Sequence, residues 1–581
     1  MDRGLCRRAK FIKNPTKHLK NRWDRIGLAS MSGRLGYLEK VLSRPFSRSA
    51  WYFGIVTFFL LLVLIPATYV LTVAVSDWAT IERVVLSDPT TRSLVIDSLA
   101  LSFEIAAVVT VLNFVAGLPM AWVLARREFR GRELIDTLID MPLAVPTSAL
   151  GFSVALFWGS SSGMGPFLGW SGGLVSSGAI AVILVHVAFS YPYMVRSIAA
   201  ILAEIDIMYE IAGRTLGASP LTAARTITLP LFKIGLSTGI LLSFARSISE
   251  TGATMIALDI VKSADKTAPV LIGVWKGQPG MIPAASFVSA VLIVLAVILM
   301  FSARIVVYRA KIPLRKVFPH LEKRLSSNLP IRLRNVLTVA FLSAIVLVPS
   351  FFIFAYIVQG QIPSSFDWSI FWRSLADSFL VAGTVTAANT VLGIPMAIVI
   401  ARKKIRFVTP LFDILSSIPM IVPTAALGFS LGLFWSNQTW FPFKAPLWLL
   451  ILAHTAFTYP FIVRNMAGAL EEIDPTLEDA ARSLGANSLQ VFRRITFPLT
   501  KMSILAGGIM MFTRSLGETG ATLAVLTPEQ RLQAPTAPVM IVDFVNKGFY
   551  GAASLSCVIV IGVTYALMLL LRRIAKGRVV I

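Results

Sequence analysis

Charged residues and cysteines are both scarce in this chain of 581 residues. Asp, Glu, Lys and Arg make up 14% of the sequence, whereas soluble domains carry about 25%. Hydrophobic residues reach 56% and the mean hydropathy is +0.74. A soluble globular protein is therefore excluded, and a protein that crosses a membrane many times is predicted.

Patterns for metal, redox and nucleotide chemistry are also missing. The two cysteines, Cys6 and Cys557, are too few and too far apart for a disulfide framework or a metal site. The phosphate-binding pattern G-x-x-x-x-G-K-[ST] is absent, as is H-E-x-x-H. We therefore expect no metal, no cofactor and no ATP hydrolysis by this chain, and an intramembrane enzyme is disfavoured.

Long apolar runs dominate what is present. Runs of about 20 residues, the length that crosses about 30 Å of hydrocarbon, predict an all-α polytopic fold with about twelve transmembrane helices arranged as six plus six. Prolines interrupt the third and ninth of them. The predicted spans are 51–75, 98–124, 138–159, 176–199, 234–258, 284–307, 335–358, 376–401, 410–435, 446–468, 503–526 and 553–572.

The positive charges gather in short segments on one side of these spans. The chain has 54 Lys plus Arg against 30 Asp plus Glu, and its first fifty residues alone carry 13 basic and 3 acidic side chains. The 308–333 segment and the C-terminal end are also basic. Because short cytoplasmic loops are enriched in Lys and Arg, both termini are predicted to be cytoplasmic.

The two sets of six spans have closely similar sequences. IDMPLAVPTSALGFSVALFW in the first half matches SSIPMIVPTAALGFSLGLFW in the second, and RSISETGAT matches RSLGETGAT. Because six crossings return the chain to the same side, both copies enter the membrane in one orientation, as a parallel repeat about an axis along the membrane normal. A pathway on that axis would be lined by both halves.

A polar loop is repeated within the two halves. It reads EIAGRTLGASPLTAARTITLPL at 210–231 and EDAARSLGANSLQVFRRITFPL at 478–499. Gly217 and Gly485 suit the left-handed residue just past a helix end, and Ser219 and Asn487 suit the cap of a second helix. Each copy is therefore predicted to be a helix, a tight turn and a second helix that ends at a proline before the next span.

This helix pair has the shape of a docking plug. Glu210 and Glu478 lie beside small residues, so each glutamate is expected to enter a groove of a partner and to pair with a basic residue there.

The repeated motif E-x-A-x-x-L-G-A resembles the cytoplasmic coupling loop of ABC-importer permeases of the type I class, and the resemblance covers roughly residues 95–307 and 372–572. It implies a transmembrane permease fed by an extracytoplasmic solute-binding protein, in the cell (inner) membrane of a bacterium or archaeon. It also implies that two copies of a separate cytoplasmic ABC ATPase dock on the two loops. The implied coupling residues are Glu210, Ala212, Gly213, Leu216, Gly217 and Ala218, with Glu478, Ala480, Ala481, Leu484, Gly485 and Ala486.

The spans and the resemblance together predict a domain organisation. The segments are a basic cytoplasmic tail (1–50), a first transmembrane helix with its outer loop (51–94), a first permease domain (95–307), a basic cytoplasmic linker (308–333), a seventh transmembrane helix with its outer loop (334–371), a second permease domain (372–572) and a cytoplasmic tail (573–581).

Two features of the resemblance disagree about the substrate. The segments G-E-T-G-A-T and VPTSALGF are most similar to sulfate, molybdate and tungstate permeases, whereas fused six-span halves are commoner among ferric-iron and thiamine permeases. An inorganic oxyanion is predicted first, with ferric iron or thiamine as alternatives. An alternative of another class is an ion-coupled secondary transporter of twelve helices, which would need an unpaired intramembrane carboxylate or a histidine chain.

Polar residues inside the predicted spans are candidates for the pathway or its gate. Two asparagines and two tyrosines occupy equivalent positions in the two halves, and each half has an Arg and a Glu four residues apart on one helix face. The alternative for each is hydrogen bonding that only packs helices together. The candidates are Asn113, Asn389, Tyr191, Tyr459, Arg246, Glu250, Arg514 and Glu518.

Overall fold

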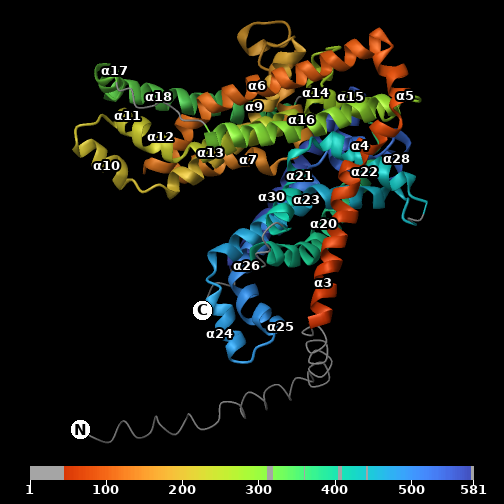
Figure 1. Cartoon of the computed structure of the whole chain (residues 1–581). Helices are drawn as coiled ribbons and strands as arrows, with labels where there is room; N and C mark the ends of the chain where they lie inside the picture. The colour runs from red at the N-terminus through yellow and green to blue at the C-terminus, as the bar shows by residue number, and fades with distance from the viewer. Residues whose placement is uncertain are drawn as a thin grey trace, which may run out of the picture.

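A computed structural model describes residues 45–309, 318–358, 360–364, 366–402, 408–439 and 442–576. All regular structure in these ranges is helical, which confirms the predicted all-α class. In Figure 1 two groups of helices meet near α4, α22 and α30, and the short helices of the two repeated loops lie at the outer ends of these groups.

The helices of the first half have the following bounds. They are α3 (Pro45–Phe58), η1 (Phe59–Leu64), α4 (Ile65–Ser76), α5 (Trp78–Ile81), η2 (Glu82–Leu86), α6 (Pro89–Arg126), α7 (Arg132–Ala144), α8 (Thr147–Gly159), η3 (Pro166–Leu168), α9 (Gly178–Glu204), α10 (Met208–Thr215), α11 (Pro220–Ala223), η4 (Ala224–Thr228), α12 (Leu229–Leu231), α13 (Lys233–Ile248), α14 (Gly252–Ile260), α15 (Ala268–Trp275) and α16 (Ile282–Arg309).

The linker and the second half follow. Their helices are α17 (Pro319–Leu325), α18 (Asn328–Phe341), η5 (Leu342–Leu347), α19 (Val348–Tyr356), α20 (Trp368–Arg402), α21 (Val408–Ile421), α22 (Thr424–Asn437), α23 (Pro446–Glu472), α24 (Thr476–Ser483), α25 (Ser488–Val491), η6 (Phe492–Thr496), α26 (Phe497–Leu516), α27 (Gly520–Val525), α28 (Pro528–Gln533), α29 (Ala537–Asn546) and α30 (Tyr550–Lys576).

Fewer continuous spans are present than the twelve predicted. Among the described residues nine helices are long and apolar enough to cross a membrane, or up to eleven if each of two bent pairs is one span. The third predicted span is a bent pair, in which α7 and α8 meet at 105°. Val145 between them is extended, because the residue before a proline, here Pro146, is disfavoured in the helical region. The ninth predicted span is likewise divided into α21 and α22.

The predicted 308–333 linker is partly helical. Helix α16 runs to Arg309, and α18 begins at Asn328. The helix that carries the seventh predicted span therefore begins inside this segment, which also contains a helix of its own, α17.

The first span of each half packs on the other half. Helices α3, η1 and α4 lie against α20, α22 and α23, and helices α18, η5 and α19 lie against α6, α8 and α9. These two crossing helices, which we call the exchanged arms, hold the halves together.

A serine hydroxyl fixes each exchanged arm. Ser430 on α22 donates to the Pro66 carbonyl (2.7 Å) and accepts from the Val70 amide (2.9 Å). In the other half, Ser153 on α8 makes the same two bonds, at 2.7 and 2.9 Å, to Pro349 and Ile353. Each hydroxyl thus stands between a carbonyl and the amide four residues later, which are normally bonded to each other in a helix. A side chain inserted in this way is a recognised cause of helix bending.

Replacing Ser153 or Ser430 with alanine is expected to loosen the arms. Each change removes two buried hydrogen bonds between helices, and hydrogen bonds between membrane helices contribute about 0.6 to 1.7 kcal/mol. We expect each variant to unfold at a lower temperature or denaturant concentration, with additive effects in the double variant. Ser302→Ala is the matched control, since its hydroxyl is exposed and bonds only within its own helix. If the wild type, the two single variants and the double variant are equally stable, the role given to these serines is contradicted.

Candidate functional site

The first repeated loop has the predicted helix, turn and helix. Helix α10 ends at Thr215, and Gly217 just past its end has a φ of +91°, in the left-handed region. The Ala218 amide donates to the Gly213 carbonyl (3.1 Å), the bond of a Schellman cap. Ser219 accepts from the Thr222 amide (3.2 Å) and caps α11, as expected.

The second loop repeats this geometry with different residues. Gly485 has a φ of +87° and follows α24. Asn487 caps α25 in a reciprocal capping box with Gln490. The predicted ending at the prolines differs between the loops: in the first loop α12 ends at Leu231, directly after Pro230, and is bent by 73° from α13, whereas in the second loop the helix runs on through Pro498 in α26. Both prolines occupy a first-turn position, where the missing N–H is tolerated.

The two loops differ at one small residue, and the difference has a packing reason. A Cβ added to Gly213 would lie 2.5 Å from the Ile227 side chain, on the second helix of the same loop. The second loop has Ala481 at this position. The first helix pair is therefore packed too closely for alanine without a shift of Ile227.

The two glutamates pair inside this chain, which differs from the predicted pairing with a partner. Glu210 contacts Arg126, the last residue of α6, at 3.2 Å. Glu478 contacts Arg402, the last residue of α20, at 3.3 Å, and also Arg482 at 3.4 Å.

Each arginine also holds the entrance to its loop. Arg126 donates to the Ile205 carbonyl (2.9 Å) and Arg402 to the Ile473 carbonyl (3.2 Å). A threonine after each turn completes the site, since Thr228 donates to Glu210 and Thr496 donates to Glu478. The glutamates therefore attach each helix pair to the end of a membrane helix of the same half.

The tips of the loops are apolar and uncovered. Leu216 is 89% exposed and Leu484 is 90% exposed, and they follow α10 and α24 directly. Met208 and Tyr209 on α10 are also exposed. Large apolar side chains exposed on a loop are typical of a protein-binding surface.

The linker helix α17 braces the first loop. Glu322 on α17 forms an ion pair with Arg225 (2.6 Å) and accepts from the Thr222 hydroxyl (2.5 Å). Ser326, just past α17, accepts from the Leu221 amide (3.2 Å). The Thr222 hydroxyl, with the Phe318 amide and Arg225, holds the pKa of the Glu322 carboxyl below its usual range.

Glu322→Ala is expected to release this brace. A hydrogen bond to a charged group contributes about 1.5 to 3 kcal/mol, so amide hydrogen exchange at 219–228 should accelerate by about tenfold or more. Because the folded pKa is lowered, the contact is present at neutral pH and is lost as the pH falls through that lowered value. Glu128→Ala, which removes an exposed ion pair with Arg132, should leave exchange in the loop unchanged. Unaltered exchange in Glu322→Ala would contradict the brace.

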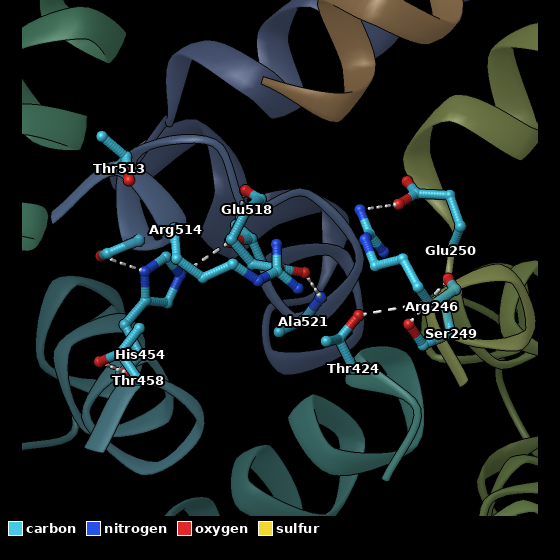
Figure 2. Close-up of polar contacts among 12 residues, drawn as sticks. Arg246, Ser249, Glu250, Thr424, His454, Thr458, Thr513, Arg514, Glu518 and Ala521 are labelled. Carbon is cyan, nitrogen blue, oxygen red and sulfur yellow. Dashed lines mark hydrogen bonds and ion pairs between the residues drawn. The ribbon is translucent and has the colours of Figure 1, made fainter. Parts of the chain in front are cut away.

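The two predicted Arg–Glu pairs are present where the halves meet. Arg246 contacts Glu250 at 2.7 Å and Arg514 contacts Glu518 at 2.5 Å. Figure 2 shows the first pair on olive helices of the first half and the second pair on blue helices of the second half. The Thr424 hydroxyl donates across the interface to the Ser249 carbonyl (3.2 Å).

The residues after each glutamate close the interface. A Cβ added to Gly252 would lie 2.4 Å from the Thr519 methyl group, and one added to Gly520 would lie 2.7 Å from the Thr251 hydroxyl. The Thr-Gly segments of the two halves thus pack against each other, each glycine under the threonine of the other half. Only glycine permits backbones to approach so closely.

The predicted asparagines lie between helices of their own half. Asn113 is buried and donates to Ser190 (2.7 Å) and Ser243 (3.1 Å). Asn389 is buried and donates to the Thr455 carbonyl (3.1 Å) and the Thr458 hydroxyl (2.9 Å). These contacts are those of the packing alternative.

The predicted tyrosines contact the exchanged arms. The ring of Tyr191 lies 5.6 Å from that of Phe341 on α18, and the ring of Tyr459 stacks on Phe59 of η1 at 5.8 Å. Both are buried, and their hydroxyls are 3.4 Å from carbonyls of α6 and α20. Their contacts indicate arm attachment.

Histidines and serine motifs also have structural contacts. His186 bonds Ser247 and Thr254, and His454 bonds Ser515 and Thr522, at 2.8 to 3.1 Å. The pattern G-x-S-x-G, a mark of nucleophilic serine when it forms a strand-to-helix turn, occurs at 159–163, 169–173, 235–239 and 428–432. The last two copies lie inside helices α13 and α22, the first begins at the end of α8, and the second follows η3, so none has that context.

Comparison with known proteins gives a family for both halves. The model of the family "Binding-protein-dependent transport system inner membrane component" matches residues 113–312 and again 389–580. Each match contains one repeated loop and one Arg–Glu pair. Together they cover more than half of the chain.

Individual relatives are sulfate permeases. The chain is 31% identical over 246 residues to the sulfate transport system permease protein CysT of Salmonella typhimurium, which covers 42% of this chain and 87% of that protein. The Escherichia coli K12 protein of the same name is 30% identical over equal shares. A probable sulfate permease protein of Nephroselmis olivacea is 33% identical over 182 residues, 31% of this chain and 64% of the relative. The chain therefore belongs to the family of binding-protein-dependent transport system inner membrane components, with two copies of the family's domain fused in one polypeptide.

Proposed function

We propose that this chain is the complete transmembrane part of an ATP-driven importer for sulfate or a related tetrahedral oxyanion. The observation that carries the proposal is the repeated loop, present once in each family domain, with an uncovered leucine at each tip. Two copies of a separate ATPase dock on Leu216 and Leu484. Closure of the ATPase dimer then moves the two halves through the ion pairs that attach the loops to α6 and α20.

The substrate assignment is supported by the relatives. The sequence features alone leave an oxyanion, ferric iron and thiamine open, whereas the named relatives are all sulfate permeases. A binding protein would deliver the anion at the outer loops 160–175, 259–283, 436–446 and 527–552, on the side opposite the basic cytoplasmic segments.

The ion-coupled alternative is less well supported by the carboxylates. Two buried glutamates, Glu250 and Glu518, lie where the two halves meet, and each is paired with an arginine. A coupling ion would require a carboxylate that is free to load and unload it.

Reconstitution tests the function directly. The chain is purified with candidate ATPase and binding-protein subunits and placed in vesicles, and uptake of labelled sulfate, labelled iron and thiamine is compared with and without ATP. We expect two ATPase subunits per chain and ATP-dependent uptake of sulfate only. Uptake driven by a proton or sodium gradient without the ATPase would favour the secondary transporter, and uptake of iron or thiamine would replace the substrate.

A further inference from the structure

A hollow lies where the two halves meet, beside the two ion pairs. The space inside it is about 30 Å³, and about 350 Å³ when the open space at its mouth is included. The first half contributes the α7–α8 bend, Tyr193 and Arg246, and the second half contributes Thr513, Arg514 and Gly517. The basic groups of both halves therefore line one cavity.

The acidic partners are held away from this hollow. Neither Glu250 nor Glu518 is among the residues that line it. Glu250 accepts from the Ala253 amide (3.2 Å), and Glu518 accepts from the Ala521 amide (2.9 Å). Each carboxylate is thus attached to the first turn of α14 or α27 with one oxygen and to its arginine with the other.

One of the two arginines has a donor without a partner. Nη1 of Arg246 is buried, and no described residue accepts a hydrogen bond from it. A buried donor without an acceptor is costly, so an acceptor brought within its reach would be bound favourably. A guanidinium presents five N–H donors in a planar fork that matches oxyanion geometry.

Aromatic rings hold both guanidinium groups in place. The central carbon of the Arg246 guanidinium lies 4.6 Å from the centre of the Phe189 ring, and that of Arg514 lies 5.6 Å from the Phe457 ring. Contacts of this type favour the cation over the ring face. Thr147, Thr513 and Tyr193 add hydroxyl groups to the lining.

We propose that this hollow is a transit site in which Arg246 and Arg514, one from each half, bind a tetrahedral oxyanion such as sulfate together. The proposal rests on the proposed function and assigns the site to it. Because each arginine already has a glutamate, the anion meets donors without a large net positive charge and is held weakly. Weak binding suits a pathway, since a transported ion must enter the site and also leave it.

The decisive variants are Glu250→Gln and Glu518→Gln together. Glutamine keeps one acceptor oxygen for the backbone amide, but its nitrogen is a donor, so the negative charge and the bond that the second oxygen makes to the arginine are both lost. Binding of labelled sulfate to the purified full-length chain, without ATPase or binding protein, should tighten by about tenfold or more, in line with charge-assisted hydrogen bonds. A gain of binding cannot result from misfolding. Asp377→Asn is the matched control, because Asp377 also has an arginine four residues away on its helix but lies outside the hollow.

A second variant gives the opposite result. Changing Arg246, Glu250, Arg514 and Glu518 all to glutamine keeps the pairs neutral, and sulfate binding should be lost in protein that elutes and melts like the wild type. Molybdate and tungstate should compete with sulfate, and thiamine should not. Competition by anionic phospholipid alone, with no effect of free oxyanions, would overturn the proposal and make the hollow a lipid headgroup site.

The outcomes separate this site from the function. If the reconstituted complex imports sulfate but the double glutamine variant binds it no better than the wild type, the transit site is wrong and the importer stands. If the chain binds sulfate as described but the complex imports another solute, the site stands and the substrate of the importer is wrong.

Discussion

Sulfate uptake should fall to background when Glu210 and Glu478 are both replaced with arginine. In the structure these carboxylates lie against Arg126 and Arg402, and the variants would place like charges there. Breaking a buried ion pair costs about 3 to 5 kcal/mol, which shifts the balance between attached and released loops by more than about a hundredfold. The measurement is ATP-dependent uptake in vesicles, together with copurification of the ATPase.

Exchanging the charges provides the control. Arg126→Glu with Glu210→Arg, and Arg402→Glu with Glu478→Arg, restore an ion pair of opposite direction and should recover part of the uptake. Recovery would place the function of the glutamates inside this chain. If the exchanged proteins fold normally but no longer assemble with the ATPase, the original prediction that the glutamates pair with the ATPase is favoured instead. If the protein with Glu210→Arg and Glu478→Arg keeps full uptake, the loops are not part of the mechanism.

The second large effect is expected at the Thr-Gly contact between the halves. Gly252→Ala and Gly520→Ala place a methyl group within 3 Å of Thr519 and Thr251. Overpacking of this kind costs about 1 to 3 kcal/mol. The equilibrium between the closed and the open contact of the two halves should therefore shift toward the open one by about five- to a hundredfold. We expect sulfate to leak through vesicles without ATP, and uptake against a gradient to be lost.

Gly383→Ala and Gly468→Ala are the matched controls for this contact. Both glycines lie within membrane helices, α20 and α23, and an added Cβ would meet nothing within 4 Å. These variants should transport like the wild type. Tight vesicles and normal uptake in Gly252→Ala with Gly520→Ala would show that the contact does not gate the pathway.

Features that depend on neighbouring residues could be predicted from the sequence. The left-handed glycines, the Ser219 and Asn487 caps and the Arg–Glu pairs four residues apart all follow from local rules, and the structure contains them. The repeat itself located both loops and both family domains. The orientation in the membrane stays a prediction.

Contacts between distant segments could not be predicted in this way. Arg126 is 84 positions from Glu210, and both are ordinary loop charges in a sequence that suits several topologies. Tyr191 and Tyr459 are candidates for a pathway or gate because polar groups in a span suggest a lumen, and the sequence pattern gives no sign of their ring contacts with the exchanged arms. Pro66 and Pro349, in the middle of apolar runs, were the available signal for the serine contacts.

The exchanged arms also bear on how the protein is made. Val70 of the first arm bonds Ser430, which is 360 positions later in the chain. At a synthesis rate of about 5 to 20 residues per second, the first helix waits about 20 to 70 s in the bilayer before its partner emerges from the ribosome. During that interval the Pro66 carbonyl and the Val70 amide do not have the Ser430 hydroxyl as their partner, and the nascent first half is an incomplete folding unit. Assembly of this membrane protein is therefore completed only after the second half has been inserted.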